Sequence, residues 1–508
     1  MTDRRAEGAL LLAATFVIAV SGLAYELIAG AAASYLLGDS VTQFSLVVGI
    51  FMTAMGLGAW ASRYVEDPTR AFCTAQIALG LIGGFSAPLF FLAWLHAEPF
   101  EVVLFGIVIV TGALSGLEIP LIVRILEKLG LTRHAVSNVL TLDYAGALVA
   151  ALIFPLVVVP RLGLLSGSLV FGMLNLGVAL IAIRVLKPTG MRPLALACMG
   201  ALAVTGLGLV GGERAVSAAE AALYDDDVVH AEASPYQRIV VTNFRGRTRL
   251  FLDGSIQFDS RDEHRYHEAL VHPAMTRALR TADVLILGGG DGMAAREVLR
   301  YPVQSLTLVD LDPAVTRLFR DTDLARLSGS ALRDPRVTIV NRDAWVWAKG
   351  TEQRFDVIIV DLPDPRTLAL SKLYTRGFYT DLSDLLSAGG VMAVQSGAPF
   401  FARKAYWSVV ETLEATRNPH RPGARLDVVP YAVWVPSFGL WGFALAGPEL
   451  PAAPRRPPPP GLKMFAPDQW AAMRHFPEDT ARLPVEANTL RSHVLARYYE
   501  EGWAAWGQ

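Results

Sequence analysis

The sequence predicts two parts: an α-helical multi-span membrane domain over residues 1–212, then an α/β domain that carries a small N-terminal β-hairpin subdomain. Charged residues make up 18% of the 508 residues, against about 25% in soluble globular proteins. The deficit lies in residues 1–212, which hold only 11 of the 45 Lys and Arg residues and 11 of the 47 Asp and Glu residues. In the remainder, short apolar segments alternate with helix-like segments, the pattern of a parallel sheet covered on both faces.

Composition excludes several classes of protein. A net charge of −2 without a basic stripe gives no indication of nucleic-acid binding. The two cysteines, Cys73 and Cys198, lie in apolar segments and have neither the spacing of a disulfide framework nor that of a metal site. We therefore expect no nucleic-acid partner and no metal.

Seven apolar stretches of about 20 residues have the length that a bilayer requires. The first is too long for a cleaved signal peptide, and six more follow it. We expect a multi-pass protein of the cell membrane, with spans near 9–29, 41–61, 71–95, 102–123, 139–159, 163–183 and 193–212.

Lys and Arg residues gather in alternate loops between these stretches, which places the N-terminus in the cytoplasm. Seven spans would then put the C-terminal domain outside. The ligand argued below is made in the cytosol, so we expect that domain to face the cytoplasm. One span is then re-entrant or miscounted; the alternative is a domain that is truly external.

Three acidic residues, Glu26, Glu118 and Asp143, fall within the predicted spans. Charge at bilayer depth is costly and often functional. One interpretation pairs these residues with Arg or with backbone groups at helix ends. The other is a cation site that faces the interior of the bundle.

The C-terminal part begins with a linker and a β-rich subdomain, over residues 213–280. The linker is expected at Glu213–Ala222. Strand-like segments at Tyr236–Asn243 and Thr248–Leu252 flank Arg245-Gly246, which predicts a hairpin. A helix that carries Tyr266 and His267 is expected to begin near Asp262.

Residues 281–450 read as the α/β domain, and a Pro-rich linker and tail follow over 451–508. In parallel sheets of this kind, ligands bind at the carboxyl ends of the strands. Every chemically interesting residue below lies at such an end. The strands are expected at Val284–Leu287, Ser305–Asp310, Arg336–Val340, Phe355–Val360 and Val391–Gln395.

The run Leu287–Gly292 is the strongest local motif, because its glycines, Gly288 and Gly290 among them, follow a strand and open a helix. Glycine lets the backbone approach a nucleoside closely. The run also fits the dinucleotide pattern GxGxxA, which is weak evidence alone.

Acidic residues end the next two strands. Asp310 lies 20 residues after Gly290, where an acid can accept hydrogen bonds from both ribose hydroxyls. This fits NAD and adenosylmethionine-type ligands equally. Asp343 and Ala344 end the third strand, where adenine is usually recognised. The competing interpretation of Asp310 and Asp343 is a helix N-cap.

Asp291 discriminates between ligands. A carboxylate inside the glycine loop would repel a ligand's carboxylate and attract a bare ammonium. This favours decarboxylated S-adenosylmethionine over S-adenosylmethionine itself.

The fourth strand ends in Asp361-Leu362-Pro363-Asp364-Pro365. Two carboxylates three residues apart form a stiff acidic corner that can hold a polycation. One of them can take a proton from an ammonium as the amine becomes a nucleophile. The competing interpretation is a surface turn.

Together these residues resemble the spermidine synthases, the polyamine aminopropyltransferases, in their bacterial membrane-fused form. The resemblance covers roughly residues 234–446, and its ordered motifs make chance unlikely. It implies a Rossmann-like, methyltransferase-type fold. The motifs are Ser234-Pro235-Tyr236-Gln237, Leu252-Asp253-Gly254 with Gln257, Asp262-Glu263, Tyr266-His267-Glu268, Gly288–Gly292, Asp310, Asp343-Ala344, Asp361 with Asp364-Pro365, Phe378-Tyr379, Gly389-Gly390, Gln395 and the segment Val435–Gly439.

The resemblance implies a role for each site residue. Asp361 is the general base, and the glycine loop with Gln237, Asp310, Asp343 and Ala344 holds the thioadenosine. Asp291 and His267 contact the aminopropyl or polyamine chain. Asp364, Tyr266 and Gln257 help to place the amine.

The implied reaction transfers the aminopropyl group of decarboxylated S-adenosylmethionine to a diamine, by default putrescine. Spermidine and methylthioadenosine are the products. The resemblance implies no cofactor beyond this co-substrate, and a homodimer or higher homo-oligomer.

Two departures from the family pattern bear on the acceptor. Soluble members commonly read DSSDP or DCTDP where this chain reads Asp-Leu-Pro-Asp-Pro. They often carry a tyrosine where this chain has Val435. Cadaverine, agmatine and longer polyamines therefore stay open as acceptors.

Three alternatives remain. A methyltransferase on the same sheet would bind S-adenosylmethionine with its carboxylate, against which Asp291 argues. A polyamine transporter or sensor would only bind its ligand, against which Asp361 and Asp364 argue. In a combined protein, the spans would move or sense the polyamines that the other domain makes.

Overall fold

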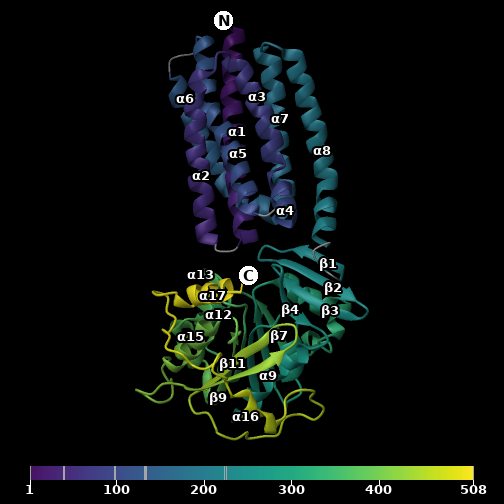
Figure 1. Cartoon of the computed structure of the whole chain (residues 1–508), viewed down its shortest axis with the longest axis vertical. Coiled ribbons are helices and arrows are strands. Elements are labelled where there is room, and N and C mark those ends of the chain that lie inside the picture. Colours follow the sequence, from purple (N-terminus) through teal and green to yellow (C-terminus); the bar gives the residue numbers. More distant parts are fainter. Residues whose placement is uncertain are drawn as a thin grey trace. The chain divides into compact units, whose positions relative to one another are not determined.

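The computed structural model describes residues 2–37, 40–96, 99–130, 134–221, 224 and 226–506. The chain divides into two compact units, 1–227 and 228–508 (Figure 1). The predicted boundary at 212 falls inside a helix, because α8 (Met191–Ala221) continues through most of the stretch expected to be a linker.

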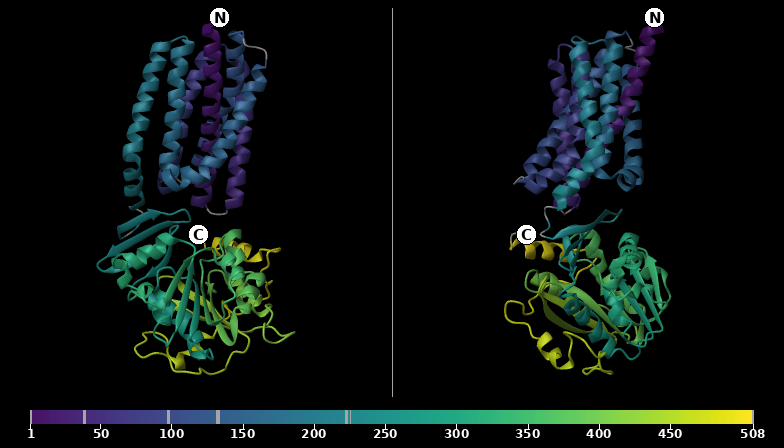
Figure 2. Two further views of the ribbon diagram at one scale, coloured as in Figure 1. Left: turned by 180° about the vertical axis from the view of Figure 1, so that it is seen from behind. Right: turned by 90° about the vertical axis from the view of Figure 1, so that its right-hand side faces the viewer.

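The first unit is a bundle of long apolar helices (Figure 2). All seven predicted stretches lie within helical segments. A short 3-10 turn, η1 (Ser62–Tyr64), and a π-helical segment, η2 (Phe154–Leu162), join neighbouring helices. Besides α8, the bundle contains α1 (Thr2–Leu37), α2 (Ser40–Ala61), α3 (Pro68–Gly84), α4 (Ser86–His96), α5 (Phe100–Lys128), α6 (Ala135–Ile153) and α7 (Gly163–Leu186).

By length and composition, five helices of the described residues could cross a membrane, or six if the bent pair α3 and α4 forms one span. One of the five is the 52-residue stretch Ala135–Leu186. At about 1.5 Å per residue it is more than twice as long as the bilayer core of about 30 Å. Figure 1 shows its two ends as separate helices, α6 and α7. The described residues therefore provide five helices of crossing length, or six with the bent pair, and the seven spans expected from the sequence stay a prediction.

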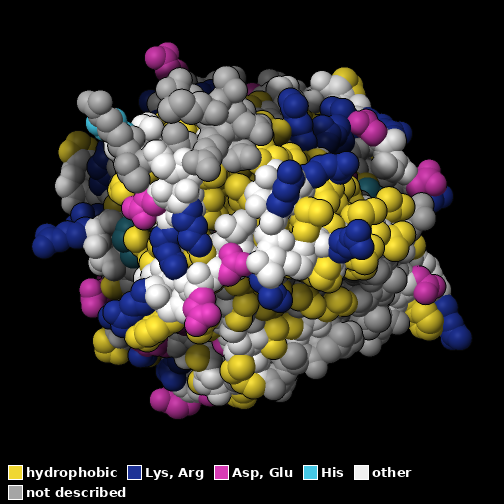
Figure 3. All heavy atoms as spheres, turned by 90° about the horizontal axis from the view of Figure 1, so that it is seen from above, with side chains coloured by type: hydrophobic (Ala, Val, Ile, Leu, Met, Phe, Trp, Pro, Cys, Tyr) yellow, Lys and Arg dark blue, Asp and Glu magenta, His cyan; other side chains and the backbone are white. Residues whose placement is uncertain are grey.

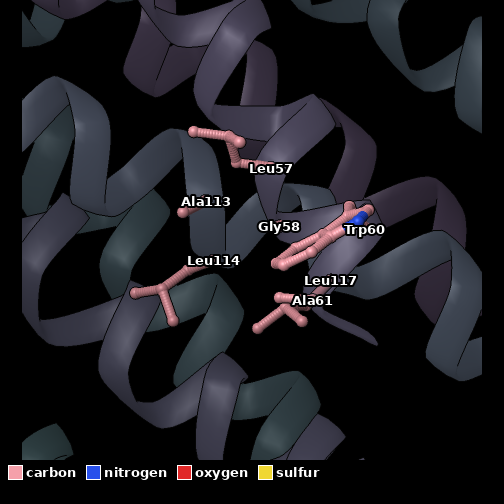
Figure 4. A pocket seen from close by; sticks show the side chains of 7 residues that line it. All are labelled: Leu57, Gly58, Trp60, Ala61, Ala113, Leu114 and Leu117. Atoms are coloured by element: carbon pink, nitrogen blue, oxygen red, sulfur yellow. The ribbon is translucent and has the colours of Figure 1, made fainter. Parts of the chain in front are cut away.

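Small residues allow the bundle helices to approach closely. A Cβ on Gly58 of α2 would overlap the carbonyl group of Ala113 on α5, and one on Gly116 would overlap that of Met55. Small residues serve the same purpose between helices in membranes. The groove between α2 and α5 is lined by Leu, Ala and Gly residues and by Trp60, so the indole nitrogen is the one polar side-chain atom among its lining residues (Figure 4).

The loops with Lys and Arg residues, apart from the segment η2 that carries Arg161, lie at one end of the bundle. Seen from that end, dark-blue Lys and Arg side chains gather among hydrophobic ones (Figure 3). The described loops and helix ends contribute Arg63, Arg70, Arg124, Lys128, Arg184, Lys187 and Arg192.

Glu118 faces the interior of the bundle. It is buried in α5 and accepts a hydrogen bond of 2.5 Å from the Gln76 amide of α3. The expected pairing with Arg or with a helix end is therefore wrong for this residue. Glu26 and Asp143 are only half-buried. A cation site at Glu118 stays a prediction.

The second unit opens with a four-stranded sheet of order β1-β2-β3-β4. The predicted hairpin is β2 (Arg238–Phe244) paired antiparallel with β3 (Arg247–Leu252). Arg245 and Gly246 form its turn with φ of 52° and 81°, as a two-residue hairpin loop requires. Two strands that were not predicted, β1 (Asp227–Ala233) and β4 (Ser255–Asp259), complete the sheet.

A seven-stranded sheet of order β10-β11-β9-β8-β5-β6-β7 forms the centre of the unit. The five predicted strands are present and parallel. They are β5 (Asp283–Gly288), β6 (Ser305–Asp310), β7 (Val337–Asn341), β8 (Phe355–Asp361) and β9 (Leu386–Gly397). The expectation of a wholly parallel sheet is wrong, because β10 (Asp427–Val435) and β11 (Gly439–Gly447) run antiparallel at one edge.

Helices cover both faces of this sheet. Successive residues of β5 alternate between two cores: Ile286 packs into one, and Leu285 and Leu287 pack into the other. This alternation is the two-residue period of a strand that is buried on both sides. The helices of the first core are α9 (Glu263–Arg277), α10 (Met293–Val298), α11 (Pro313–Asp321) and α16 (Trp470–Met473). Those of the second core are α12 (Ala344–Gly350), α14 (Arg376–Asp384), α15 (Arg403–Glu414) and α17 (Val494–Ala504). The single-turn helix α13 (Leu368–Ser371) follows β8.

The segment 451–508 is not a free tail. Arg456 donates hydrogen bonds to the carbonyls of Met275 and Leu279 at the end of α9. The buried Glu268 of α9 accepts three backbone N–H groups from residues 463–465. The segment is therefore tied to the helix that carries Tyr266 and His267.

Candidate active site

The carboxyl ends of β5 and β8 meet at the centre of the sheet. Gly288 pairs in register with Asp361. Gly288 has a φ of 84°, and a Cβ at this position would overlap the Asp361 carbonyl oxygen. Only glycine combines this conformation with this approach at low cost. Gly288 therefore allows the glycine loop to pack directly against Asp361, the first residue of the acidic corner.

Asp310 lies beside the same loop at the end of β6. Its carboxylate accepts the N–H groups of Gly290 at 3.0 Å and Asp312 at 2.9 Å. Burial raises the pKa of Asp310 to about 6, although these N–H groups oppose the shift. The N-cap of α11 is Asp312, not Asp310. The interpretation of Asp310 as a cap is therefore wrong, and its carboxylate is oriented at the ligand edge of the sheet.

Gln237 reaches this edge from the hairpin subdomain. Its amide donates to Asp312 Oδ2 at 3.0 Å, and the Ser234 hydroxyl donates to the same oxygen at 2.7 Å. Asp312 therefore joins the subdomain to the strand end that holds Asp310. Asp312 was not among the predicted site residues.

Asp343 is the N-cap of α12, so the capping interpretation holds for this residue. Its carboxylate accepts the N–H of Trp345 at 2.8 Å and the Lys372 ammonium at 2.9 Å. Ala344, the first residue of α12, is buried. Both residues lie one strand beyond Asp310 in the sheet, on the side away from Asp361.

Asp361 is half-buried at the end of β8 and accepts a hydrogen bond of 2.6 Å from the Tyr266 hydroxyl. Burial raises the pKa of Asp361 to about 6, and the neighbouring Asp291 adds to the rise. The nearby His267 and the Tyr266 hydroxyl oppose it. Asp361 is therefore ionised at neutral pH and can still accept a proton.

His267 places a positive charge near Asp291 and Asp361. It is 2% exposed, and its Nδ1 lies 2.8 Å from Glu263 Oε2. Burial alone would lower the pKa of His267, but Glu263 raises it to about 9. Arg296 holds Glu263 from the other side with two hydrogen bonds of 3.0 and 2.9 Å. His267 is thus a cation at neutral pH, which favours ionisation of Asp291 and Asp361.

Asp291 lies in the glycine loop, where its Oδ1 accepts the N–H of Met293 at 2.8 Å. Burial raises the pKa of Asp291, and the charge of His267 lowers it. Asp291 and His267 were predicted as site residues, whereas the ion pair between His267 and Glu263 was not.

Asp364 forms the second half of the acidic corner. The Gln395 amide donates to its Oδ1 at 3.3 Å, and the Tyr499 hydroxyl donates to its Oδ2 at 3.0 Å. Gln395 also bonds the Leu362 carbonyl and the Tyr374 hydroxyl, both at 2.6 Å. The corner is therefore held by hydrogen bonds and is not a surface turn.

Gln257 is the predicted site residue with the least support. On β4, its amide donates to the nearby Ser255 carbonyl at 3.1 Å. Its strand does meet the corner, because Arg366 donates to the Ser255 hydroxyl at 2.6 Å. Among the described residues, no group of three or more His, Cys, Asp or Glu side chains could hold a metal ion.

Comparison with known proteins decides the family. Residues 263–451 match the family model of the spermine/spermidine synthase domain. A polyamine aminopropyltransferase of Leptospira interrogans is 41% identical over 498 residues, which cover 97% of this chain and 98% of that protein. The chain belongs to the polyamine aminopropyltransferases. Polyamine aminopropyltransferase 2 of Ralstonia nicotianae is 44% identical over 516 residues, with 97% and 98% covered.

The polyamine aminopropyltransferase relatives match along nearly the whole chain, so the likeness includes the helical unit. Among solved structures, a spermidine synthase from Thermotoga maritima is 24% identical with a TM-score of 0.40 and covers 55% of this chain and 88% of that one. A spermidine synthase in complex with the transition state analogue AdoDATO is 23% identical, with a TM-score of 0.41. The relatives show that this chain is an aminopropyltransferase, and its own seven-stranded mixed sheet with helices on both faces is Rossmann-like.

The family model contains most of the aminopropyltransferase site but not all of it. Asp291, Asp310, Asp361 and Asp364 lie within the match, whereas Gln237, Gln257 and Tyr499 lie outside it. Tyr499 was not predicted as a site residue. Its segment was expected only to be a linker and tail, and nothing in the sequence pairs residues 364 and 499.

Proposed function

We propose that the enzyme transfers the aminopropyl group of decarboxylated S-adenosylmethionine to a diamine, with putrescine as the default acceptor. Spermidine and methylthioadenosine are the products. The observation that carries this proposal is the position of Asp361, a half-buried carboxylate at the end of β8 that Tyr266 holds at 2.6 Å. Asp364 follows Asp361 by three residues, which suits the second ammonium of a diamine, and Asp291 in the glycine loop suits the ammonium of the donor.

Asp361 supplies the one proton transfer that the reaction needs. An ammonium of the acceptor gives its proton to Asp361 and becomes a nucleophile. The nitrogen lone pair then forms a bond to the methylene carbon next to the sulfonium. The carbon–sulfur bond breaks, its electron pair stays on sulfur, and neutral methylthioadenosine leaves. Because the sulfonium is already activated, orientation and this deprotonation are the main contributions of the protein.

Asp291 supports the choice of donor. A half-buried carboxylate in the glycine loop favours the ammonium of a decarboxylated donor and repels the α-carboxylate of S-adenosylmethionine. The methyltransferase alternative is therefore disfavoured. The binding-only transporter or sensor is disfavoured too, since full-length relatives are named as transferases.

Mass spectrometry of the products tests this function. The detergent-purified chain is incubated with decarboxylated S-adenosylmethionine and putrescine, cadaverine, agmatine or spermidine. We expect methylthioadenosine to form only when an amine is present, and spermidine to form from putrescine. The best acceptor identifies the substrate. Protein that is folded and binds the nucleoside but releases no methylthioadenosine with any amine would contradict the proposal.

We also propose that the helical unit spans the cell membrane and that the catalytic unit faces the cytosol, where the donor is made. Seven crossings and the Lys and Arg loops would place the catalytic unit outside, so the assignment needs a direct test. Cys73 and Cys198 are buried and give a low labelling background. A cysteine at the exposed Gly350 should react with a membrane-impermeant maleimide only after cell lysis. Labelling in intact cells would contradict the cytosolic assignment.

A further inference from the structure

The C-terminal helix α17 contributes a side chain to the acidic corner. The Tyr499 hydroxyl donates to Asp364 Oδ2 at 3.0 Å, although 135 residues separate the two in sequence. Tyr499 lies 48 residues beyond the end of the matched synthase domain at 451. The site therefore includes a group from a segment outside the family domain.

Packing fixes the position of this helix. The Trp503 ring stacks on Phe401 with ring centroids 4.9 Å apart. A Cβ on Gly502 would lie 2.7 Å from the Ala402 Cα, so the backbone of α17 rests directly on the segment before α15. Glu501 adds an ion pair of 3.0 Å with Lys404. Tyr499 is thus held at Asp364 by three neighbouring contacts.

The approach to α17 is fixed as well. Asn488 is fully buried, and its amide donates to the carbonyls of Ser371 at 3.0 Å and Tyr374 at 3.2 Å. These carbonyls follow the acidic corner along the chain. The tail and the corner therefore share one hydrogen-bonded network, and the position of the phenol is coupled to that of the carboxylate.

Tyr499 determines how Asp364 presents its charge. Burial raises the pKa of Asp364, and the hydrogen bonds from Tyr499 and Gln395 lower it. Each donor holds one carboxylate oxygen. With the phenol removed, Oδ2 loses its donor, and a carboxylate is less stable as an anion without its hydrogen bonds.

We propose that Tyr499 is a positioning residue for the acceptor amine, which orients the Asp364 carboxylate toward the ammonium that does not react. This rests on the proposed function. The residue acts through Asp364, so it governs binding of the amine and not of the nucleoside.

The test compares Tyr499→Phe with Tyr498→Phe in the full-length chain. Tyr498 is adjacent on the same helix, and its ring faces Lys404 and Arg497 instead of Asp364. We expect Y499F to raise the KM for the amine about tenfold or more, the size of a lost hydrogen bond to a charged group. Its KM for the donor and its kcat at saturating amine should change less than about twofold, and Y498F should match the wild type.

A double-mutant cycle shows whether Tyr499 acts through Asp364. In an Asp364→Asn background, Y499F should raise the amine KM much less than in the wild type. An unchanged amine KM in Y499F would overturn the proposal. An equal rise in the KM values for donor and amine would also overturn it. So would an equal rise in the amine KM on Y499F in the wild-type and Asp364→Asn backgrounds. A wild-type enzyme that releases no methylthioadenosine would instead contradict the proposed function.

Discussion

The Tyr266 hydroxyl donates a hydrogen bond of 2.6 Å to Asp361 Oδ1 and so joins helix α9 to the end of β8. The two residues are 95 positions apart and come from different layers of the unit. Because Tyr266 is only 8% exposed, its hydroxyl is fixed by packing and holds the carboxylate in one orientation. The base is therefore positioned before the substrate binds.

Removing this phenol should move the acid limb of the pH–rate profile. Asp361 must be ionised to accept a proton, so kcat/KM of the wild type should fall as the pH drops through about 6. Tyr266 stabilises the ionised form, so Tyr266→Phe should raise the pKa of Asp361. A hydrogen bond to a charged group contributes about 1.5–3 kcal/mol, which moves the limb to about pH 7 or above.

The measurement is kcat/KM for the amine between pH 5 and 8 at saturating donor. Tyr374→Phe is the control, because Tyr374 donates to backbone carbonyls near the corner and not to Asp361. An acid limb that stays at the wild-type pH in Y266F would show that the bond does not tune the base.

Glu263 should control the charge of His267. The pKa of His267 is about 9 because Glu263, with Asp291 and Asp361, outweighs the effect of burial. In Glu263→Gln the pKa of His267 should fall, and Asp291 and Asp361 would lose part of a neighbouring positive charge. We expect the acid limb of kcat/KM to move to higher pH and kcat at pH 7 to fall. An NMR titration that still finds a charged His267 at pH 8 in E263Q would contradict this.

A methyl group in the glycine loop should weaken nucleoside binding. A Cβ on Gly290 would lie 2.7 Å from Asp310 Oδ2, so Gly290→Ala must displace the carboxylate that is expected to hold the ribose. We predict a rise in the nucleoside Kd of about tenfold or more, measured by calorimetry with methylthioadenosine. Gly350→Ala, where a Cβ meets nothing within 4 Å, is the matched control. Equal affinities of the two variants would argue against the ribose contact.

Asp291 should decide between the two forms of the donor. Asp291→Asn removes the charge that attracts the ammonium and repels the α-carboxylate. The Kd for decarboxylated S-adenosylmethionine should rise, while that for S-adenosylmethionine stays the same or falls, so the ratio of the two shrinks by about tenfold or more. A ratio unchanged from the wild type would remove Asp291 from donor selection.

The sequence was sufficient to locate those strands and loops that a short run of consecutive residues identifies. The five segments from Val284 to Gln395 were located as strands because each is a short, mostly apolar run bounded by turn residues, although β7 at the sheet edge is only partly buried. The glycine loop was located because its glycines directly follow one of these runs. Strands β10 and β11 were missed because Pro430 and several glycines interrupt their pattern, and their pairing is fixed by contact with β9.

The site was predictable where a residue ends a strand and not where the chain returns from far away. Asp310 and Asp361 each follow an apolar run, so the topology alone places them at one edge. Tyr499 reaches Asp364 only because the tail is bound along α9 and packed on α15, and neither contact leaves a local signal. Asp343 is a different case. It also follows an apolar run, but both of its possible roles, helix N-cap and contact with adenine, fit that position, so the sequence alone could not decide between them.

The most direct test of the central claim is methylthioadenosine release by Asp361→Asn, measured beside calorimetric binding of the nucleoside to the same protein. The account predicts that D361N binds the nucleoside with nearly wild-type affinity but turns over about 10² times more slowly or worse, since it has lost its general base. Turnover close to that of the wild type, with the nucleoside bound, would show that Asp361 is not the base.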